Sequence, residues 1–252
     1  MNGTYGLGAL FFLPMLQALI FDVDGTLADT ERDGHRIAFN AAFRDAGLPW
    51  NWDVRQYGQL LAISGGKERI AHYARLHAPD LAARPDFDAF LRKLHALKTG
   101  HYVHLVAAGA LPLRPGIANM LREARKAGIK LAIASTTSPE NVAALLRASL
   151  AHDAERWFEV IGAGDIVAAK KPAPDVYFWV LERLGLAAAD CLAVEDSANG
   201  LKAARAAGIP ALVTANDYTR GQDFSGALAV LPDFAAMCLV ELQVLHAQGT
   251  AL

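Results

Sequence analysis

Cysteine is scarce in this sequence, with two residues among 252. Cys191 and Cys238 show neither the CxxC spacing nor the paired histidines of a zinc site, and two cysteines cannot build a disulfide framework. Both lie in apolar stretches, so we expect buried free thiols. Free thiols fit a reducing cytoplasm, which is the compartment we predict.

A surplus of charge of one sign is also lacking, since 24 Lys and Arg residues stand against 26 Asp and Glu residues. A chain without a surplus of basic residues has no positive electrostatic potential that would attract nucleic acid or an acidic membrane, so we expect neither partner. An anionic substrate has to be met by a few local cations. We expect a monomer, with a dimer as the alternative.

Long apolar runs are absent as well, because no stretch approaches the roughly 20 residues of a membrane-spanning helix. The apolar beginning, residues 1–14, lacks the basic start and the small-residue cleavage site of a signal peptide. We interpret it as a poorly ordered extension ahead of Met15, which would be the natural start.

The sequence does contain an alternation of short apolar runs and alanine-rich helical stretches. Strands are expected at residues 17–21, 130–134, 158–161, 191–194 and 210–213. Helices are expected at 117–126, 139–148, 175–184 and 198–206. Short buried strands joined by crossover helices predict an α/β fold with a Rossmann-like parallel sheet. No GxGxxG follows the first strand, which counts against a dinucleotide-binding fold.

Residues 30–110 interrupt this alternation, because they read as helices without a convincing strand. The expected helices cover 37–46, 67–76, 87–97 and a continuation through 104–108. An insertion of this size after the first strand predicts a separate, all-helical cap domain. We therefore divide the chain into an extension (1–14), a core (15–29 and 111–252) and a helical cap (30–110).

Polar residues stand where the expected strands end, which is the edge at which parallel sheets bind ligands. Asp22 and Asp24 follow the first strand, and Gly25 lets the chain turn so that both carboxylates can approach one ligand. One carboxylate can attack phosphorus while its neighbour protonates the leaving oxygen and then activates water. Taken alone, the pattern would rather indicate an aspartate turn that caps a loop.

The segment 22–26, DVDGT, resembles the first motif, DxDGT, of the haloacid dehalogenase superfamily of phosphotransferases. The resemblance covers nearly the whole chain from Leu16. It implies that Asp22 is the nucleophile and that Asp24 is the general acid/base.

The second motif of the superfamily, a hydroxyl residue after an apolar strand, corresponds to Ser135. The resemblance implies that Ser135 and the backbone N–H groups of Thr136 and Thr137 hold the transferring phosphoryl group. The local sequence agrees, because Ser138, Pro139 and an acidic residue form a helix start whose N-terminus favours an anion.

The third motif, KPxPD, begins at Lys171, and the fourth is the acidic pair Glu195 and Asp196. The resemblance implies that Lys171 offsets charge on the nucleophile and the phosphoryl oxygens, whereas Lys170 is expected in a solvated loop. It points to Asp196 as a direct Mg²⁺ ligand and to Glu195 as a supporting one, with a surface acidic pair as the alternative. Oxygen ligands suit Mg²⁺; the expected set is Asp22, Asp24, Glu195 and Asp196.

A helical cap after the first motif marks a subgroup that includes β-phosphoglucomutase, phosphoglycolate phosphatase and the CbbY proteins. The segments 29–36, 64–70 and 217–224 are similar to CbbY-like phosphatases of xylulose-1,5-bisphosphate. The resemblance implies that the sugar and a second phosphate are met by Glu31, Ser64, Gly65, Gly66, Lys67, Arg69 and Lys98. The alternative for each of the three cations is a charged helix exterior. We expect His35, His72 and His101 to be merely packed or exposed.

The resemblance thus predicts a Mg²⁺-dependent phosphatase that hydrolyses a small sugar phosphate, such as xylulose-1,5-bisphosphate, through an aspartyl-phosphate. A phosphoglucomutase-type enzyme, which returns the phosphoryl group to the sugar, and a phosphoglycolate-type phosphatase are the alternatives. A binding protein on an inactive scaffold would lack a nucleophile or a metal ligand, and neither is missing.

Overall fold

The computed structural model describes residues 15–249, so the predicted extension at 1–14 lies outside the described residues. The strands are β1 (Ala18–Phe21), β2 (Lys130–Ala134), β3 (Val160–Gly162), β4 (Cys191–Glu195), β5 (Ala211–Thr214) and β6 (Val230–Leu231). They form one sheet in the order β3-β2-β1-β4-β5-β6. Every pairing between these strands is parallel.

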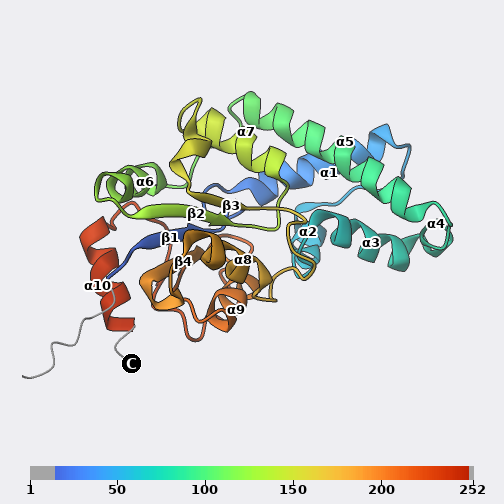
Figure 1. Cartoon of the computed structure of the whole chain (residues 1–252). Coiled ribbons are helices and arrows are strands. Elements are labelled where there is room, and N and C mark those ends of the chain that lie inside the picture. Colours follow the sequence, from blue (N-terminus) through green and yellow to red (C-terminus); the bar gives the residue numbers. More distant parts are fainter. Residues whose placement is uncertain (1–14, 250–252) are drawn as a thin grey trace, which may run out of the picture.

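Helices cover both faces of the sheet, which is why its strands are short apolar runs. These helices are α6 (Ile117–Lys126), α7 (Pro139–Ser149), α8 (Asp175–Leu184), α9 (Ala198–Ala206) and α10 (Leu239–Gly249). One apolar cluster joins Leu19 of β1 to Ile117 and Leu145, and a second joins Ile20 to Val176 and Leu201. Successive β1 residues thus pack against opposite layers, with α6 and α7 above the sheet and α8 and α9 below it in Figure 1. The predicted α/β fold is confirmed.

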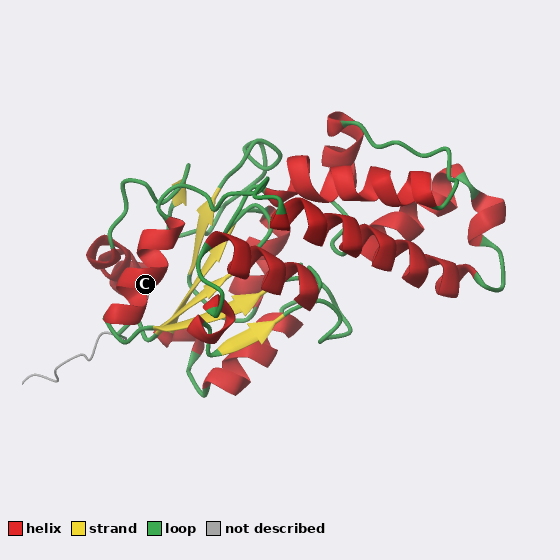
Figure 2. Cartoon of the chain, turned by 90° about the horizontal axis from the view of Figure 1, so that it is seen from above, coloured by secondary structure: helices red, strands yellow, loops and turns green. Residues whose placement is uncertain are grey.

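The segment between β1 and β2 is helical, as expected for a cap. It contains a π-helical turn (Glu31–His35), α1 (Arg36–Asp45), α2 (Val54–Leu60), α3 (Gly66–His77), α4 (Pro79–Ala82) and α5 (Phe87–Ala107). The cap has its own apolar core of aromatic rings, in which Phe43 and Trp52 meet edge to face at 4.7 Å. It projects to one side of the sheet in Figure 2. The boundaries at residues 30 and 110 stay predictions.

Two extended segments connect the cap to the core and lie side by side. Ala28 and Leu113 form an isolated antiparallel bridge, and the backbone N–H of Arg114 donates to Leu27 O at 2.8 Å. The connections are therefore held together where they leave the sheet.

Several sequence expectations need correction. The helix expected at 87–97 does continue through 104–107 as α5, whereas α2, α10 and β6 were not anticipated. Cys191 is buried, but Cys238 is exposed just before α10, so the expectation of two buried thiols was wrong. Within residues 15–249, no helix has the length and apolar character needed to cross a membrane.

Candidate active site

Asp22 follows directly after β1, and its side chain is 11% exposed. The Lys171 ammonium donates to Asp22 Oδ1 at 2.8 Å, to Glu195 Oε1 at 2.6 Å and to Ala134 O at 2.7 Å. Burial raises the pKa of Asp22 to about 7, although Lys171 acts in the opposite direction. Because a protonated carboxyl is a poor nucleophile, further positive charge near Asp22 would favour its reactive form.

Lys171 keeps its charge because carboxylates surround it. Burial alone would lower the pKa of Lys171, but Asp22 and Glu195 raise it above the usual value. Tyr177 also donates its hydroxyl hydrogen to Glu195 Oε1. The ammonium is thus fixed against the Asp22 carboxylate by two further partners, Glu195 and a backbone carbonyl.

Asp22, Glu195 and Asp196 bring one carboxylate oxygen each within 4.8 Å of one another, and all three residues are buried. Burial, together with the charges of Asp22 and Glu195, raises the pKa of Asp196 well above its usual value. Asn216 Nδ2 donates to Asp196 Oδ2 at 2.7 Å. Three buried carboxylates with one ammonium leave surplus negative charge, and an all-oxygen donor set of this kind fits Mg²⁺.

Asp24 is held from the cap side of the first loop. Thr30 Oγ1 donates to Asp24 Oδ1 at 2.6 Å, and His35 Nε2 lies 2.8 Å from the same oxygen. Burial alone would raise the pKa of Asp24, but His35 and Thr30 hold it below the usual range. His35 was expected to be merely packed or exposed; it is 3% exposed and directly contacts an expected catalytic residue.

Lys98 lies behind His35 and does not reach the cavity. Its ammonium donates to His35 Nδ1 at 2.6 Å, which leaves the Nε2 hydrogen for Asp24. The alternative of a charged helix exterior is wrong for Lys98, which is 3% exposed. The contacts form a chain from α5 of the cap to Asp24 of the core.

Ser135 follows β2 in a loop that leads into α7. The Ser135 hydroxyl oxygen accepts from the N–H of Thr137 at 3.3 Å, and Ser138 caps α7 by accepting from Asn141 N at 3.4 Å. The Thr137 hydroxyl is occupied by the Asn141 side chain at 3.1 Å. The predicted helix start is therefore present beside the cavity.

On the cap side, Glu31, Tyr57 and Arg69 form one hydrogen-bonded group. The Tyr57 hydroxyl donates to Glu31 Oε2, and Arg69 Nη1 donates to the Tyr57 oxygen at 2.9 Å. Arg69 is 6% exposed, so it is not on a charged helix exterior. Arg69 also donates to the carbonyls of Leu60 and Ile63, which ties α3 to the end of α2.

These groups surround a cavity of about 80 Å³ between core and cap. Its lining contains ten of the expected site residues: Asp22, Asp24, Glu31, Ser64, Arg69, Ser135, Thr136, Lys171, Glu195 and Asp196. The other five do not line it: Gly65, Gly66, Lys67, Lys98 and Thr137. Asn199 and Asn216, which also line the cavity, were not anticipated.

Lys67 instead forms an ion pair between cap and core, with Asp165 after β3. Lys170 binds the same carboxylate at 2.8 Å and is 12% exposed, so its expected place in a solvated loop was wrong. Hydrogen bonds from Lys170 and Lys67 lower the pKa of Asp165 to about 2. Asn199 of the core also contacts the cap, because its Nδ2 donates to Ser64 Oγ at 3.3 Å.

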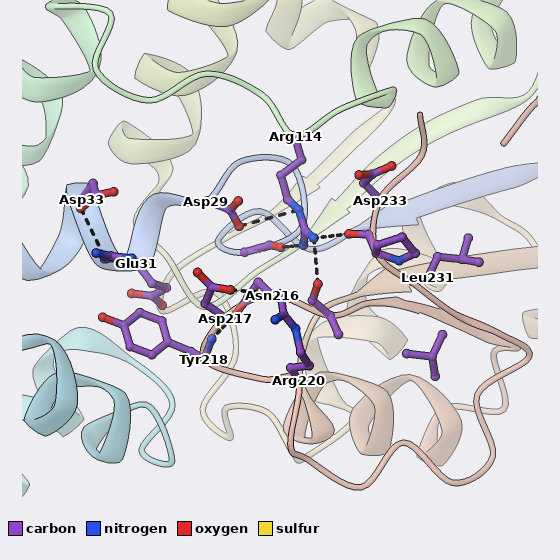
Figure 3. A pocket seen from close by; sticks show the side chains of 15 residues that line it. Asp29, Glu31, Asp33, Arg114, Asn216, Asp217, Tyr218, Arg220, Leu231 and Asp233 are labelled. Carbon is purple, nitrogen blue, oxygen red and sulfur yellow. Dashed lines mark hydrogen bonds and ion pairs between the residues drawn. The ribbon is translucent and has the colours of Figure 1, made fainter. Parts of the chain in front are cut away.

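A larger pocket of about 530 Å³ lies beside the catalytic cavity and shares Glu31, Asn216 and Tyr218 with it. Figure 3 shows this pocket, with the buried Arg114 side chain among carbonyl oxygens. The Tyr218 ring lies 6.1 Å from the Tyr57 ring of the cap, centroid to centroid. Glu31, Asn216 and Tyr218 thus line both the pocket and the cavity.

A helical cap over the carboxyl edge of a Rossmann-like sheet, with carboxylates and a lysine between them, defines a class of α/β hydrolases. The chain belongs to the haloacid dehalogenase-like hydrolase family, whose model matches residues 16–208. It is accordingly a phosphatase.

Individual relatives are similar over most of the chain. The plasmid CbbY protein of Cupriavidus necator is 56% identical over 86% of this chain and 85% of its own length. A crystal structure of a CbbY mutant from Rhodobacter sphaeroides with xylulose-(1,5)bisphosphate is 46% identical, covers 91% of this chain and 100% of that chain, and has a TM-score of 0.85. A phosphorylated carbohydrates phosphatase of Thermotoga maritima is 31% identical over 77% of this chain and 82% of its own length.

Proposed function

We propose that this protein hydrolyses a small sugar bisphosphate, such as xylulose-1,5-bisphosphate, with Asp22 as the nucleophile and Mg²⁺ as the cofactor. The observation that carries the proposal is the position of Asp22, buried at the end of β1 between Lys171 and two further carboxylates. The similarity to a CbbY structure that holds this bisphosphate supports the choice of substrate.

In the first step an Asp22 oxygen attacks phosphorus, and the bond between phosphorus and the sugar oxygen breaks. Lys171, 2.8 Å from Asp22 Oδ1, offsets negative charge on the attacking carboxylate and on the phosphoryl oxygens. Ser135 and Thr136, at the start of α7, lie where they can donate to the phosphoryl group. Water then attacks phosphorus and releases phosphate from Asp22.

Asp24 lies in the same cavity and serves both steps. It gives a proton to the departing sugar oxygen in the first step and takes one from water in the second. His35 and Thr30 keep the pKa of Asp24 below its usual range, so Asp24 is ionised, which is the form that the base role requires. The acid role requires those contacts to loosen, and both come from segments that enter the cap.

Asp22, Asp196 and the backbone carbonyl of Asp24 would hold Mg²⁺, with Glu195 in support. When bound, the ion supplies positive charge that favours the ionised Asp22 and neutralises the phosphoryl oxygens. Surplus buried negative charge around Asp196 supports this assignment.

The cap supplies the groups that select the substrate. Arg69 uses three of its five N–H donors on partners within residues 15–249, which leaves two for a phosphate. Glu31 and Ser64 face the same cavity and can bind sugar hydroxyls. A cavity of about 80 Å³ is smaller than the several hundred Å³ of typical ligand sites, so the cap opens to admit a sugar bisphosphate.

Phosphate release tests the proposal, measured with and without Mg²⁺ on xylulose-1,5-bisphosphate, ribulose-1,5-bisphosphate, phosphoglycolate and β-glucose-1-phosphate. Strong preference for the first substrate with Mg²⁺ is the expected result. Metal-dependent hydrolysis of another compound would retain the chemistry and overturn the substrate. Conversion of β-glucose-1-phosphate into another sugar phosphate, with a catalytic bisphosphate present, would indicate a mutase instead.

A further inference from the structure

Arg114 lies in the segment that returns from the cap to the core, and its side chain is 6% exposed. The sequence did not mark it as a site residue. The backbone N–H of Arg114 donates to Leu27 O in the segment that leads from the core to the cap. Arg114 therefore lies where the two connections between core and cap run side by side. A buried arginine keeps its charge, and that charge requires partners.

The partners of the guanidinium are backbone carbonyls (Figure 3). Nη1 donates to Gly25 O and, at 2.7 Å, to Thr214 O. Nη2 donates to Ala215 O at 2.9 Å and to Pro232 O at 2.6 Å. The carboxylate paired with Arg114, that of Asp29, lies 3.7 Å from Nε and is 66% exposed. Arg114 therefore holds several loops together and does little as an ion-pair partner.

Two of these loops carry expected metal ligands or their supports. Gly25 follows Asp24 directly, and Thr214 and Ala215 precede Asn216, which donates to Asp196 Oδ2 at 2.7 Å. The loops touch at Gly25, where φ is +82° and an added Cβ would lie 2.2 Å from Asp196 Oδ2 and 2.6 Å from Asn216 Nδ2. A shift of either loop would therefore move the Asp196 carboxylate relative to the Asp24 backbone.

We propose that Arg114 is a positioning residue for the metal site, acting through the Asp24–Gly25 backbone and through the Asn216–Asp196 hydrogen bond. The inference rests on the Mg²⁺ site of the proposed function. A planar guanidinium presents donors in a fixed fork that reaches several carbonyls at once, whereas a lysine ammonium is a compact charge. Arg114→Lys therefore keeps the charge and loses the geometry.

The test is Mg²⁺ binding by isothermal titration calorimetry, without substrate, at a temperature where every variant is folded by circular dichroism. Loss of the groups that orient metal ligands costs about 10- to 100-fold in metal affinity, so we expect at least tenfold weaker binding for Arg114→Lys and Arg114→Met. The control is Arg205→Met, since Arg205 is exposed and donates to the carbonyl of Ser225 at 3.1 Å, which is not one of the carbonyls that Arg114 binds. It should bind Mg²⁺ like wild type.

The outcomes are distinguishable. Wild-type protein that binds no Mg²⁺ removes the proposed metal site, and the inference with it. If wild type binds but Arg114→Lys binds equally well with a lower melting temperature, Arg114 is only structural and the inference is overturned. If Arg114→Met does not fold, Arg114→Lys decides.

The route through Asn216 has its own test, a double-mutant cycle in Mg²⁺ affinity with Asn216→Ala. Because both residues act on Asp196, the double variant should lose less affinity than the two single losses combined. If the fold-loss of Mg²⁺ affinity in the double variant equals the product of the two single fold-losses, Arg114 does not act through Asn216.

Discussion

The core and the cap each bury a lysine near an expected catalytic aspartate, but Lys171 contacts Asp22 directly whereas Lys98 reaches Asp24 only through His35. Lys171 of the core contacts two carboxylates and a carbonyl, and Asp22 and Glu195 raise its pKa. Lys98 of the cap contacts His35 and lies over the rings of Phe39 and Tyr102. Burial lowers the pKa of Lys98 to about 8.

The comparison shows how the two regions divide their tasks. In the core, the charged side chains are held by direct ion pairs. We expect this because the same phosphoryl-transfer step must occur with every substrate. In the cap, a cation and a histidine are held among aromatic rings, where burial and distant carboxylates oppose one another. The cap is therefore where we expect ionisation and substrate preference to be adjustable.

The largest expected effect tests the core. Asp22→Asn should lower phosphate release by at least about 10³-fold, because an amide cannot form the acyl-phosphate. The far-UV circular dichroism spectrum should be unchanged, since the side chains have nearly the same shape. A matched control is Asp45→Asn on the cap surface, where the carboxylate binds His101 at 2.7 Å. Retention of a tenth of wild-type turnover by Asp22→Asn would remove the nucleophile assignment.

The second prediction sharpens the contrast between the lysines. The folded-state pKa of Lys98, about 8, lies below the value of 10.5 for a free lysine. Between these values the unfolded chain binds more protons, so the Lys98 contribution to the free energy of unfolding rises with pH. Relative to Lys98→Met, wild type should gain on the order of 2 kcal/mol from pH 8 to pH 10, measured by urea unfolding.

Lys171→Met supplies the contrast, because the pKa of Lys171 is raised. Wild type should show no such gain relative to Lys171→Met over the same pH interval. A flat difference for Lys98→Met as well would mean that the cap lysine is no easier to deprotonate than a free one.

The third prediction concerns the cations of the cap. Arg69→Met should lower kcat/KM for a bisphosphate about 10- to 100-fold more than for a monophosphate, since a hydrogen bond to a charged group is worth about 1.5–3 kcal/mol. Arg75→Met, an exposed position of the same helix, is the control. Equal losses of kcat/KM on both substrate types would show that Arg69 does not bind the second phosphate.

Lys67→Ala gives a related test on the same helix. The resemblance predicts a greater loss on bisphosphates, whereas its ion pair with Asp165 would affect both substrate types alike. Asp165→Asn separates the two cases, because it breaks the ion pair and leaves the Lys67 charge free. If only the ion pair matters, Asp165→Asn should lower activity on both substrate types as Lys67→Ala does. If Lys67 binds the second phosphate, Asp165→Asn should keep the preference for bisphosphates.

The smallest effects are expected when a cap glycine, Gly58 or Gly100, is replaced by alanine. An added Cβ at Gly58 of α2 would lie 2.9 Å from a Tyr218 ring carbon of the core, whereas one at Gly100 of α5 meets nothing within 4 Å. Gly58→Ala should raise KM a few-fold by hindering cap closure. Gly100→Ala should stabilise the fold by about 0.5–1 kcal/mol, measured by urea unfolding. A KM for Gly58→Ala equal to that of wild type would show that the Tyr218 contact does not govern closure.

The sequence predicted most of the core, because its signals are local. Short apolar runs such as 131–134, which follow a glycine-containing turn and end in polar residues, favour buried strands, and those polar residues fall at one edge of the sheet. β6 was not predicted although residues 227–231 are all apolar, because only two of them, Val230 and Leu231, form the strand. The long helix α5 was predicted at residues 87–97 with a continuation through 104–108, and the structure joins these ranges in one helix.

The missed site residues depend on contacts between distant positions. Arg114 binds carbonyls about 100 residues away, and a backbone carbonyl leaves no mark in the sequence of its partner. His35 had a weak signal, since it stands four residues after Glu31 and thus near the same helical face. Its contact with Asp24, however, depends on how the cap meets the core, which composition and periodicity do not describe.

The bridge between Ala28 and Leu113 has a consequence for how this chain can diversify. Because the two connections meet where they leave the sheet, the entropy of closing the inserted loop grows only with the logarithm of its length. Residues added to or deleted from exposed cap loops therefore add little to the cost of closing the insertion. Natural variation or directed evolution can exchange the cap for another specificity while the residues that break the phosphate ester stay as they are.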